Sequence, residues 1–434
     1  IAAANVIMGK LGAHGSLPVS VGRFKEGGGI VTNKLGAYLP SSTPQKEGVN
    51  MNLGERIEPF LQELVQQRAA PGGQVLVARN GKVIYQKAFG YHTYENQRRV
   101  KMDDMYDLAS ITKVAATTLS IMKLQEEGRI SLDDNLGKYL PYLRGSNKEN
   151  ILIRDVMLHQ ARLKSWIPFY LETLASREET YSRVSTDLKN VPIAKGMFGG
   201  GQLKNSILQQ IKDSPLRKRK SYKYSDLGFI LLKFIIEDIV GEPMNEYVDH
   251  EFYGPMGLTH TTFNPLDKFN GEGIVPTELD TLFRKQLLKG YVHDPASAMF
   301  GGVAGHAGLF SNAQEVAVLF QMLLNGGEYN GVQYLKKSTV DYFTARHGYK
   351  SRRGIGFDKR ENNPGNIMNL TDEVSLKAFG HTGFTGTCVW VDPAYNLVYV
   401  FLSNRIHPNQ ENKTLWSGNY RTEIQKKIYQ SIIQ

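Results

Sequence analysis

Two β-hairpin patterns stand at opposite ends of the main part of this chain, and they constrain its fold more than any other feature. Residues 74–78 and 83–89 are rich in β-branched and aromatic residues and flank an Asn-Gly turn, which is a strong hairpin signal. Residues 386–391 and 397–403 flank a second turn that contains a proline. Strands at both ends with mostly helical sequence between them predict one antiparallel sheet assembled from distant parts of the chain.

Helical patterns surround these strands. Residues 53–69 carry apolar side chains at helical spacing, and Ile424, Ile428 and Ile432 mark a closing helix. Residues 227–240 are apolar on most sides but are interrupted by charges and too short to cross a bilayer, so we expect a buried helix and no membrane span.

The predicted fold class is therefore α/β (α+β): an antiparallel sheet flanked by helices, with a mainly helical subdomain. We expect the sheet subdomain over about residues 53–105 and 350–434, and the helical subdomain over about 106–349. A chain of 434 residues with 41% hydrophobic residues has enough apolar material for such a core.

The first 52 residues differ from the rest. Residues 25–52 are rich in Gly, Ser, Pro and Thr and predict a linker. The chain begins at Ile1 without a secretion signal, which suggests a mature or excised fragment. The stretch from Gly12 to Ser20, which ends in Leu-Pro-Val-Ser, resembles the closing segment of family 3 glycoside hydrolases. That resemblance implies that residues 1–24 are the tail of a preceding glycoside-hydrolase-like module.

Ser110 and Lys113 form the most informative chemical motif, Ser-Ile-Thr-Lys, where a strongly helical segment begins. Side chains three residues apart share one helix face, so the amine can reach the hydroxyl and act as its base. The motif alone also fits a helix cap with a solvated lysine. The apolar helix that follows favours a buried Lys113 instead.

Two distant fragments, Tyr224-Ser225-Asp226 and His381-Thr382-Gly383, follow this motif in order. Together the three resemble the serine β-lactamase and penicillin-binding protein superfamily, especially its class C β-lactamase, D,D-peptidase and esterase branch. The resemblance covers roughly residues 50–434 and implies a two-subdomain fold with the site in the cleft between the parts.

The resemblance implies a role for each matched residue. Ser110 is the nucleophile, and its amide forms an oxyanion hole with the amide of Phe384. Tyr224 protonates the leaving group and later activates water, while Thr382 and Gly383 help to bind the substrate. Lys113 is either a neutral general base or a charged group that holds Tyr224 as a phenolate, and the sequence leaves both open.

This chain departs from the family pattern at two positions. Relatives usually carry Tyr-x-Asn, but Asp226 stands in the asparagine's place and cannot donate a hydrogen bond when ionised. We expect Asp226 either to contact Lys113 and alter substrate binding or to cap the following helix, and one residue could do both. His381 replaces a lysine and is weakly charged at neutral pH, so it would hydrogen-bond Tyr224 or the substrate. These changes favour an esterase, amidase or peptidase over a true β-lactamase.

A Ser-His-Asp triad built on His306, or on His293 with Asp294, is an alternative, but no Gly-x-Ser-x-Gly elbow carries its nucleophile. Trp166, Phe169 and Tyr170 are either an aromatic wall of the cleft or part of the core.

Other chemistries lack support in the sequence. Cys388 is the only cysteine and the histidines show no metal-ligand spacing, so we expect no metal and no cofactor. The net charge of +10 is spread along the chain without a nucleic-acid-binding motif.

We therefore predict a serine hydrolase that cleaves an amide or ester through an acyl-enzyme on Ser110. Peptidoglycan-derived peptides are the leading substrate, which implies the bacterial periplasm or cell envelope. The alternative is a catalytically silent module that binds cell-wall fragments.

Overall fold

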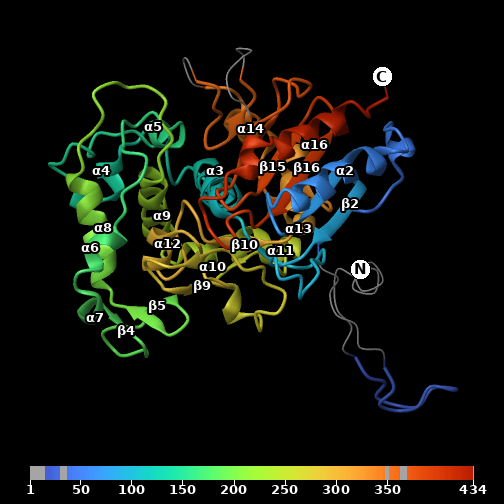
Figure 1. The fold of residues 1–434 in the computed structure, drawn as a ribbon, viewed down its shortest axis with the longest axis horizontal. Coiled ribbons are helices and arrows are strands. Elements are labelled where there is room, and N and C mark those ends of the chain that lie inside the picture. The colour runs from blue at the N-terminus through green and yellow to red at the C-terminus, as the bar shows by residue number, and fades with distance from the viewer. Residues whose placement is uncertain (1–14, 30–36, 348–350, 362–368, 434) are drawn as a thin grey trace.

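The largest sheet of the molecule is built from both ends of the chain (Figure 1). The structure is a computed structural model that describes residues 15–29, 37–347, 351–361 and 369–433. Six strands pair antiparallel in the order β13-β14-β15-β16-β1-β2. Their bounds are β1 (Gly72–Arg79), β2 (Lys82–Gly90), β13 (Asp358–Lys359), β14 (Phe379–Thr382), β15 (Cys388–Asp392) and β16 (Leu397–Ser403). The two predicted hairpins are confirmed, and they meet where β1 pairs with β16.

Both faces of this sheet are buried, and alternate residues along a strand face opposite sides. In β16, Phe401 belongs to the apolar cluster that contains α2 (Leu53–Gln66) and α16 (Tyr420–Tyr429), whereas Val400 belongs to the larger core on the other side. The helices predicted at residues 53–69 and at the end of the chain are confirmed. Ile432 lies beyond the end of α16 and pairs with Val49 instead.

One helix from the middle of the chain also covers the sheet. We expected residues 313–324 in the helical subdomain, but α13 (Ala313–Leu324) contacts β16, β15 and β1. Asn312 caps this helix by accepting a hydrogen bond from the amide of Glu315. Nearly all of α13 is buried, and an all-round apolar helix needs cover on every side. The sheet supplies one of those sides.

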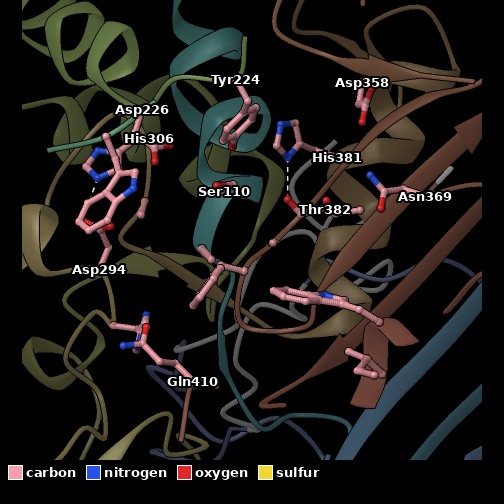
Figure 2. Close-up of a pocket in the computed structure, with 18 of the residues that line it drawn as sticks. Ser110, Tyr224, Asp226, Asp294, His306, Asp358, Asn369, His381, Thr382 and Gln410 are labelled. Atoms are coloured by element: carbon pink, nitrogen blue, oxygen red, sulfur yellow. Dashed lines mark hydrogen bonds and ion pairs between the residues drawn. The ribbon is translucent and has the colours of Figure 1, made fainter. Parts of the chain in front are cut away.

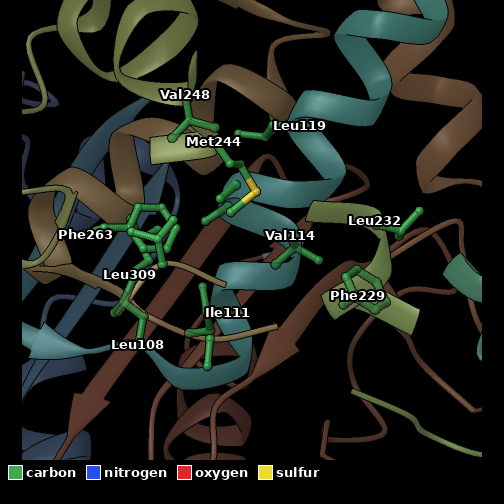
Figure 3. Packing of buried hydrophobic residues seen from close by; sticks show 14 of the residues in the cluster. Leu108, Ile111, Val114, Leu119, Phe229, Leu232, Met244, Val248, Phe263 and Leu309 are labelled. Carbon is green, nitrogen blue, oxygen red and sulfur yellow. The ribbon is translucent and has the colours of Figure 1, made fainter. Parts of the chain in front are cut away.

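The larger core runs from the sheet into the helical part, around the segment that carries Ser110 (Figure 3). Ile111 and Val114 point into this core, and Phe229 from α9 (Leu227–Val240) packs there too. The buried helix predicted at residues 227–240 is confirmed. Several helices of this part gather on the side away from the sheet (Figure 1): α4 (Leu136–Tyr139), α5 (Ile153–Met157), α6 (Tyr170–Thr173), α7 (Arg177–Thr180) and α8 (Gln202–Asp213).

The remaining elements are short and connect these layers. The other helices are α3 (Thr118–Glu126), α10 (Met244–Val248), α11 (Gly254–Met256), α12 (Pro295–Met299), α14 (Lys337–Thr344) and α15 (Thr414–Ser417). The minor sheets pair β3 (Tyr106–Asp107), β10 (Leu309–Ser311) and β7 (Thr262–Phe263); β4 (Tyr181–Ser182), β6 (Met197–Gly199) and β5 (Val191–Ala194); β8 (Leu279–Asp280) and β9 (Gln286–Leu287); and β11 (Glu328–Tyr329) and β12 (Val332–Gln333). Within the described residues, no helix is long and apolar enough to cross a membrane.

The expected linker contacts the folded body along its second half. Val83 of β2 donates a hydrogen bond to Pro40 and its carbonyl accepts one from Ser42, so this segment pairs with the sheet edge. Val49 is fully buried. The second half of the segment therefore packs on the folded body and is not a free linker. Its turn-rich composition did not reveal this, because a few apolar residues are enough to anchor it. The first three residues of the tail motif, 12–14, lie outside the described residues, so the glycoside-hydrolase expectation stays a prediction.

Candidate active site

A short, tightly held turn presents Ser110. The chain leaves β3 and enters a 3-10 turn at Ala109–Ile111, with Ala109 in the left-handed region at φ 48°. The buried carboxylate of Asp107 accepts hydrogen bonds from the amides of Ala109 at 2.8 Å and His293 at 2.7 Å. These bonds hold a backbone conformation that non-glycine residues rarely adopt.

Lys113 lies one turn later and is fully buried. Its Nζ donates hydrogen bonds to Ser110 Oγ and to the carbonyl of His306, both at 2.9 Å, and lies 2.7 Å from Asp226 Oδ1. The helix-cap interpretation with a solvated lysine is therefore wrong. Burial lowers the pKa of Lys113, but the charge of Asp226 and the proximity of Tyr224 outweigh it and raise the pKa overall. Lys113 is an ammonium at neutral pH.

Tyr224 stands over this pair. Its ring lies 5.1 Å from Lys113 Nζ and 4.5 Å from the ring of His159, measured to the centroids. Burial raises the pKa of Tyr224, and the Lys113 ammonium only partly opposes this effect. Hydrogen bonding of its buried hydroxyl toward Lys113 and Ser110 also lowers the pKa, but less than burial raises it. Tyr224 is therefore a neutral phenol next to Ser110 and Lys113.

Asp226 sits at the start of α9, but its side chain makes no capping hydrogen bond there. Its carboxylate instead pairs with Lys113, so of the two roles we expected the structure shows the contact to Lys113. The asparagine usual in relatives would bring no negative charge to this lysine. Asp226 therefore adds a negative charge next to the lysine that contacts Ser110.

His381 of β14 is buried and neutral. Burial and the nearby charges of Arg353 and Lys113 lower the pKa of His381 to about 3. Its Nδ1 lies 2.7 Å from the carbonyl of Thr382 and its Nε2 lies 3.3 Å from Arg353 Nη2. A neutral ring with these neighbours donates through Nδ1 and accepts through Nε2. We expected a hydrogen bond to Tyr224 or to the substrate; toward Tyr224 the structure shows a tilted ring contact, with centroids 5.9 Å apart.

The turn after β14 lies against the turn that carries Ser110. Thr385 and Thr387 donate side-chain hydrogen bonds to the carbonyls of Asp107 and Leu108, at 2.8 and 3.1 Å. A Cβ atom on Gly383 would come within 2.5 Å of the Leu108 carbonyl oxygen, so only glycine permits this approach. The segment that holds the Phe384 amide is thus fixed beside the turn that carries Ser110.

These residues open into one cleft of about 780 Å³ (Figure 2). Ser110, Tyr224, Asp226 and the whole segment from His381 to Phe384 line it, while Lys113 lies beneath its floor. Among the expected aromatic residues, Trp166 and Tyr170 line the cleft, whereas Phe169 is buried in the core. The described residues contain no group of three or more side chains suited to hold a metal ion.

A group of arginines in the cleft was not predicted from the sequence. Arg352 and Arg353 line it beside His381, and both pair with the buried carboxylate of Asp358. Burial raises the pKa of Asp358, but these guanidinium groups hold it well below its usual range. No local motif surrounds the two arginines, so the sequence carried no signal for them. Arg421 joins them from α16.

The acidic residue Asp294 also lines the cleft, but it does not form a triad with Ser110. Its Oδ1 lies 2.8 Å from His306 Nε2, and His293 pairs with Glu278 at the same distance. Ser110 Oγ instead accepts a hydrogen bond from Lys113 Nζ at 2.9 Å, and the hydroxyl of Tyr224 lies within hydrogen-bonding reach of it. The serine-lysine arrangement is therefore the one that the structure assembles.

Comparisons with known proteins find relatives over most of the chain. The family model described as Beta-lactamase matches residues 57–419. A putative D-alanyl-D-alanine carboxypeptidase of Escherichia coli K12 is 32% identical over 396 residues, which cover 85% of this chain and 86% of that protein. Another protein of that description, from Salmonella typhimurium LT2, is 33% identical over 413 residues, covering 87% and 90% of the two chains.

Solved structures show the same fold. The hydrolase EstCE1, described as having promiscuous acyltransferase activity, has a TM-score of 0.64 at 21% identity over 87% of this chain and 98% of its own. A β-lactamase/D-alanine carboxypeptidase from Pseudomonas syringae has a TM-score of 0.60 at 17% identity, covering 87% and 98%.

Proposed function

This chain belongs to the beta-lactamase family and is a serine hydrolase, and we propose that it removes the C-terminal residue from cell-wall peptides. The observation that carries the proposal is the contact between Lys113 Nζ and Ser110 Oγ at 2.9 Å, on the floor of an open cleft. The carboxypeptidase description of relatives more than 30% identical supports the substrate class.

In the proposed reaction, Ser110 Oγ attacks the carbonyl carbon of the scissile peptide bond and loses its proton to the Lys113–Tyr224 pair. The amides of Ser110 and Phe384 stabilise the oxyanion that forms. The phenol of Tyr224 then gives a proton to the leaving amine, and the acyl-enzyme remains on Ser110. Water, deprotonated by Tyr224, attacks the ester and releases the shortened peptide as an acid.

The protonation states of Lys113 and Tyr224 before the reaction mean that one proton must be lost first. Lys113 is an ammonium and Tyr224 is a phenol, so neither accepts a proton from Ser110 as it stands. A proton must leave the Lys113–Tyr224–Asp226 group first, either from Lys113 or from Tyr224. Both pathways predict that deprotonation limits acylation at neutral pH.

Recognition of the substrate's terminal carboxylate falls to the arginine side of the cleft. Neutral His381 brings no charge, but Arg353 lies directly behind it and Arg352 lines the same wall. Arg421 adds a third guanidinium. These groups provide the positive potential that a lysine supplies in the usual Lys-Thr-Gly motif, and Thr382 adds a hydroxyl donor. A cell-wall substrate would place this activity in the bacterial cell envelope.

The catalytically silent alternative lacks a comparable observation in its favour. A module that only binds has no need of a buried lysine within hydrogen-bond distance of a cleft serine. Burying an ammonium costs free energy unless it is paired, and here Asp226 must be kept beside it.

The test compares four substrates of the purified protein: a peptide ending in D-Ala-D-Ala, the same peptide with a C-terminal amide, a short-chain ester and a cephalosporin. We expect the free-acid peptide to give the highest kcat/KM, about tenfold above its amide, because the amide lacks the charge that the arginines bind. Preference for the ester or the cephalosporin would reject the proposal. The variant Ser110→Ala serves as the control for enzyme-dependent hydrolysis.

A further inference from the structure

We propose that the cleft contains a second charged subsite, formed by Asp294 and Trp166, that binds an ammonium group of the substrate. The inference rests on the proposed function and narrows its substrate class to peptides with a free amine near the scissile bond. Asp294 and His306 lie on one side of Ser110, whereas His381 and Asp358 lie on the other (Figure 2). The wall with Asp358 also carries Arg352 and Arg353, which outnumber that carboxylate, so the two walls differ in net charge.

Asp294 offers an ionised and partly unused carboxylate. Burial raises its pKa, but the neighbouring His306 outweighs this and holds the pKa well below the usual range. Both of its contacts, from His306 Nε2 and from the amide of Ser297, are to Oδ1. Oδ2 makes no hydrogen bond or ion pair with the described residues, and the side chain is 32% exposed. One oxygen therefore fixes the carboxylate while the other faces the cleft.

Trp166 supplies an aromatic surface beside this carboxylate. Its side chain is 60% exposed, although it is among the largest apolar residues of the chain. It lines both the main cleft and a narrow side crevice, and Asp294, Pro295 and His306 line the same crevice. No aromatic ring or cationic side chain among the described residues covers its faces. A carboxylate next to an open indole is a combination that attracts ammonium groups, through charge and through the π face.

The other charged groups around this wall are already paired. Lys113 is bound to Asp226, whose carboxylate also lines the crevice, and His293 is bound to Glu278. Within the described part of the chain no arginine lines the crevice, whereas Arg352, Arg353 and Arg421 line the main cleft. A substrate spanning Ser110 therefore meets negative potential at one end and positive potential at the other.

This polarity fits a zwitterionic peptide. Its terminal carboxylate faces the arginines, and an ammonium on the acyl side, either a side-chain amine or a free N-terminus, faces Asp294. Simple esters carry neither charge and gain from neither wall. The second subsite therefore lets the protein discriminate between peptides that have the same scissile bond but differ in the ammonium group.

The experiment measures kcat/KM for Nα-acetyl-L-Lys-D-Ala-D-Ala and for the same peptide with its ε-amine acetylated. The two differ only in the ammonium group. We expect the protein to prefer the free amine by about tenfold, the scale of a partly exposed ion pair combined with a cation–π contact. In Asp294→Asn the preference should fall to about twofold or less, and in Trp166→Leu to an intermediate value.

Both cleft variants should fold normally. Asparagine can still accept the hydrogen bond from Ser297 that starts α12, and Trp166 is exposed, so its replacement does not open the core. Asp267→Asn, an exposed change outside the cleft, should keep the full preference. Equal hydrolysis of both peptides, or a preference unchanged in both cleft variants, overturns the ammonium subsite and leaves the carboxypeptidase proposal intact. If neither peptide is hydrolysed, both proposals fail.

Discussion

At the level of single residues, we expect the charge on Lys113 to control catalysis. The ammonium is held by Asp226 at 2.7 Å, in the place where the motif predicts an asparagine. Since the carboxylate is one of the causes of the raised pKa of Lys113, we expect Asp226→Asn to lower that pKa. The acid side of the kcat/KM profile should then move to lower pH by about one unit or more.

The measurement is kcat/KM from pH 6 to 10 for the protein and for Asp226→Asn, with Asp187→Asn as an exposed control. Activity should rise with pH in all three proteins, and only the cleft variant should reach its plateau earlier. An unchanged profile in Asp226→Asn would show that neither Lys113 nor its partner limits acylation.

His381 supports a prediction about stability. Its pKa is about 3 in the folded protein and about 6.5 in the unfolded chain, so the unfolded chain binds an extra proton between these values. The free energy of unfolding therefore falls as the pH drops from 6.5 toward 4. His381→Gln lacks this contribution. Its free energy of unfolding should therefore fall less steeply with decreasing pH, by at most the slope that one bound proton contributes.

Thermal unfolding followed between pH 7 and 4.5 tests this, with the exposed His250→Gln as the matched control. The control should keep the original slope. Equal slopes in all three proteins would mean that His381 is protonated in the folded state as readily as in the unfolded one.

The motif residues could be predicted from the sequence, whereas their surroundings could not. Ser110 and Lys113 are three residues apart, so local helix geometry alone brings them together. Arg353 reaches His381 only through the pairing of β13 with β14 and the packing of the preceding loop. Nothing in its own neighbourhood of sequence distinguishes it from the other 51 basic residues.

At the scale of elements, the site depends on the contact between the end of β14 and the turn that carries Ser110. Gly383→Ala would bring a Cβ within 2.5 Å of the Leu108 carbonyl oxygen and push the two segments apart. Each segment holds one of the proposed oxyanion donors. We expect kcat/KM to fall by about 10² or more, the scale of losing one such donor.

The control is Gly201→Ala at the start of α8, where an added Cβ meets nothing within 4 Å. That variant should keep its activity, and both variants should remain folded by circular dichroism. Full activity in Gly383→Ala would show that the backbone yields at this contact without disturbing the site.

Strand and helix patterns were the most predictable features at this scale. The apolar runs of β1 and β16, which are buried on both faces, and the helical spacing in α2 follow from each element's own burial, which the sequence records. The packing of α13 against the sheet could not be predicted, because its apolar sequence indicates only that the helix is buried. It does not show whether the helix packs against the sheet or against the helical part.

At the scale of the whole molecule, the segment before α2 divides into two parts. Backbone hydrogen bonds of residues 15–29 stay within that segment in the described structure. Residues 37–52 instead pair with β2 and bury Val49, and the amide of Asn50 donates to the Ser431 carbonyl at 2.7 Å. We therefore expect different effects from removing each part.

Deleting residues 1–29 should leave Tm within about 2 °C, whereas deleting residues 1–52 should lower it by roughly 5 °C. The second deletion loses about 3–6 kcal/mol from the buried side chains of Leu39 and Val49 and a few backbone hydrogen bonds. Differential scanning calorimetry of both deletions tests this. Equal Tm values would mean that residues 37–52 dock without stabilising the domain.

Intact-protein mass spectrometry after exposure to a fluorophosphonate or a penicillin tests whether Ser110 is the nucleophile. We expect a single adduct on the protein and none on Ser110→Ala, while Ser221→Ala, a change at an exposed serine, should react as the unchanged protein does. An adduct that persists in Ser110→Ala, or its absence from the unchanged protein with both reagents, would show that Ser110 is not the nucleophile.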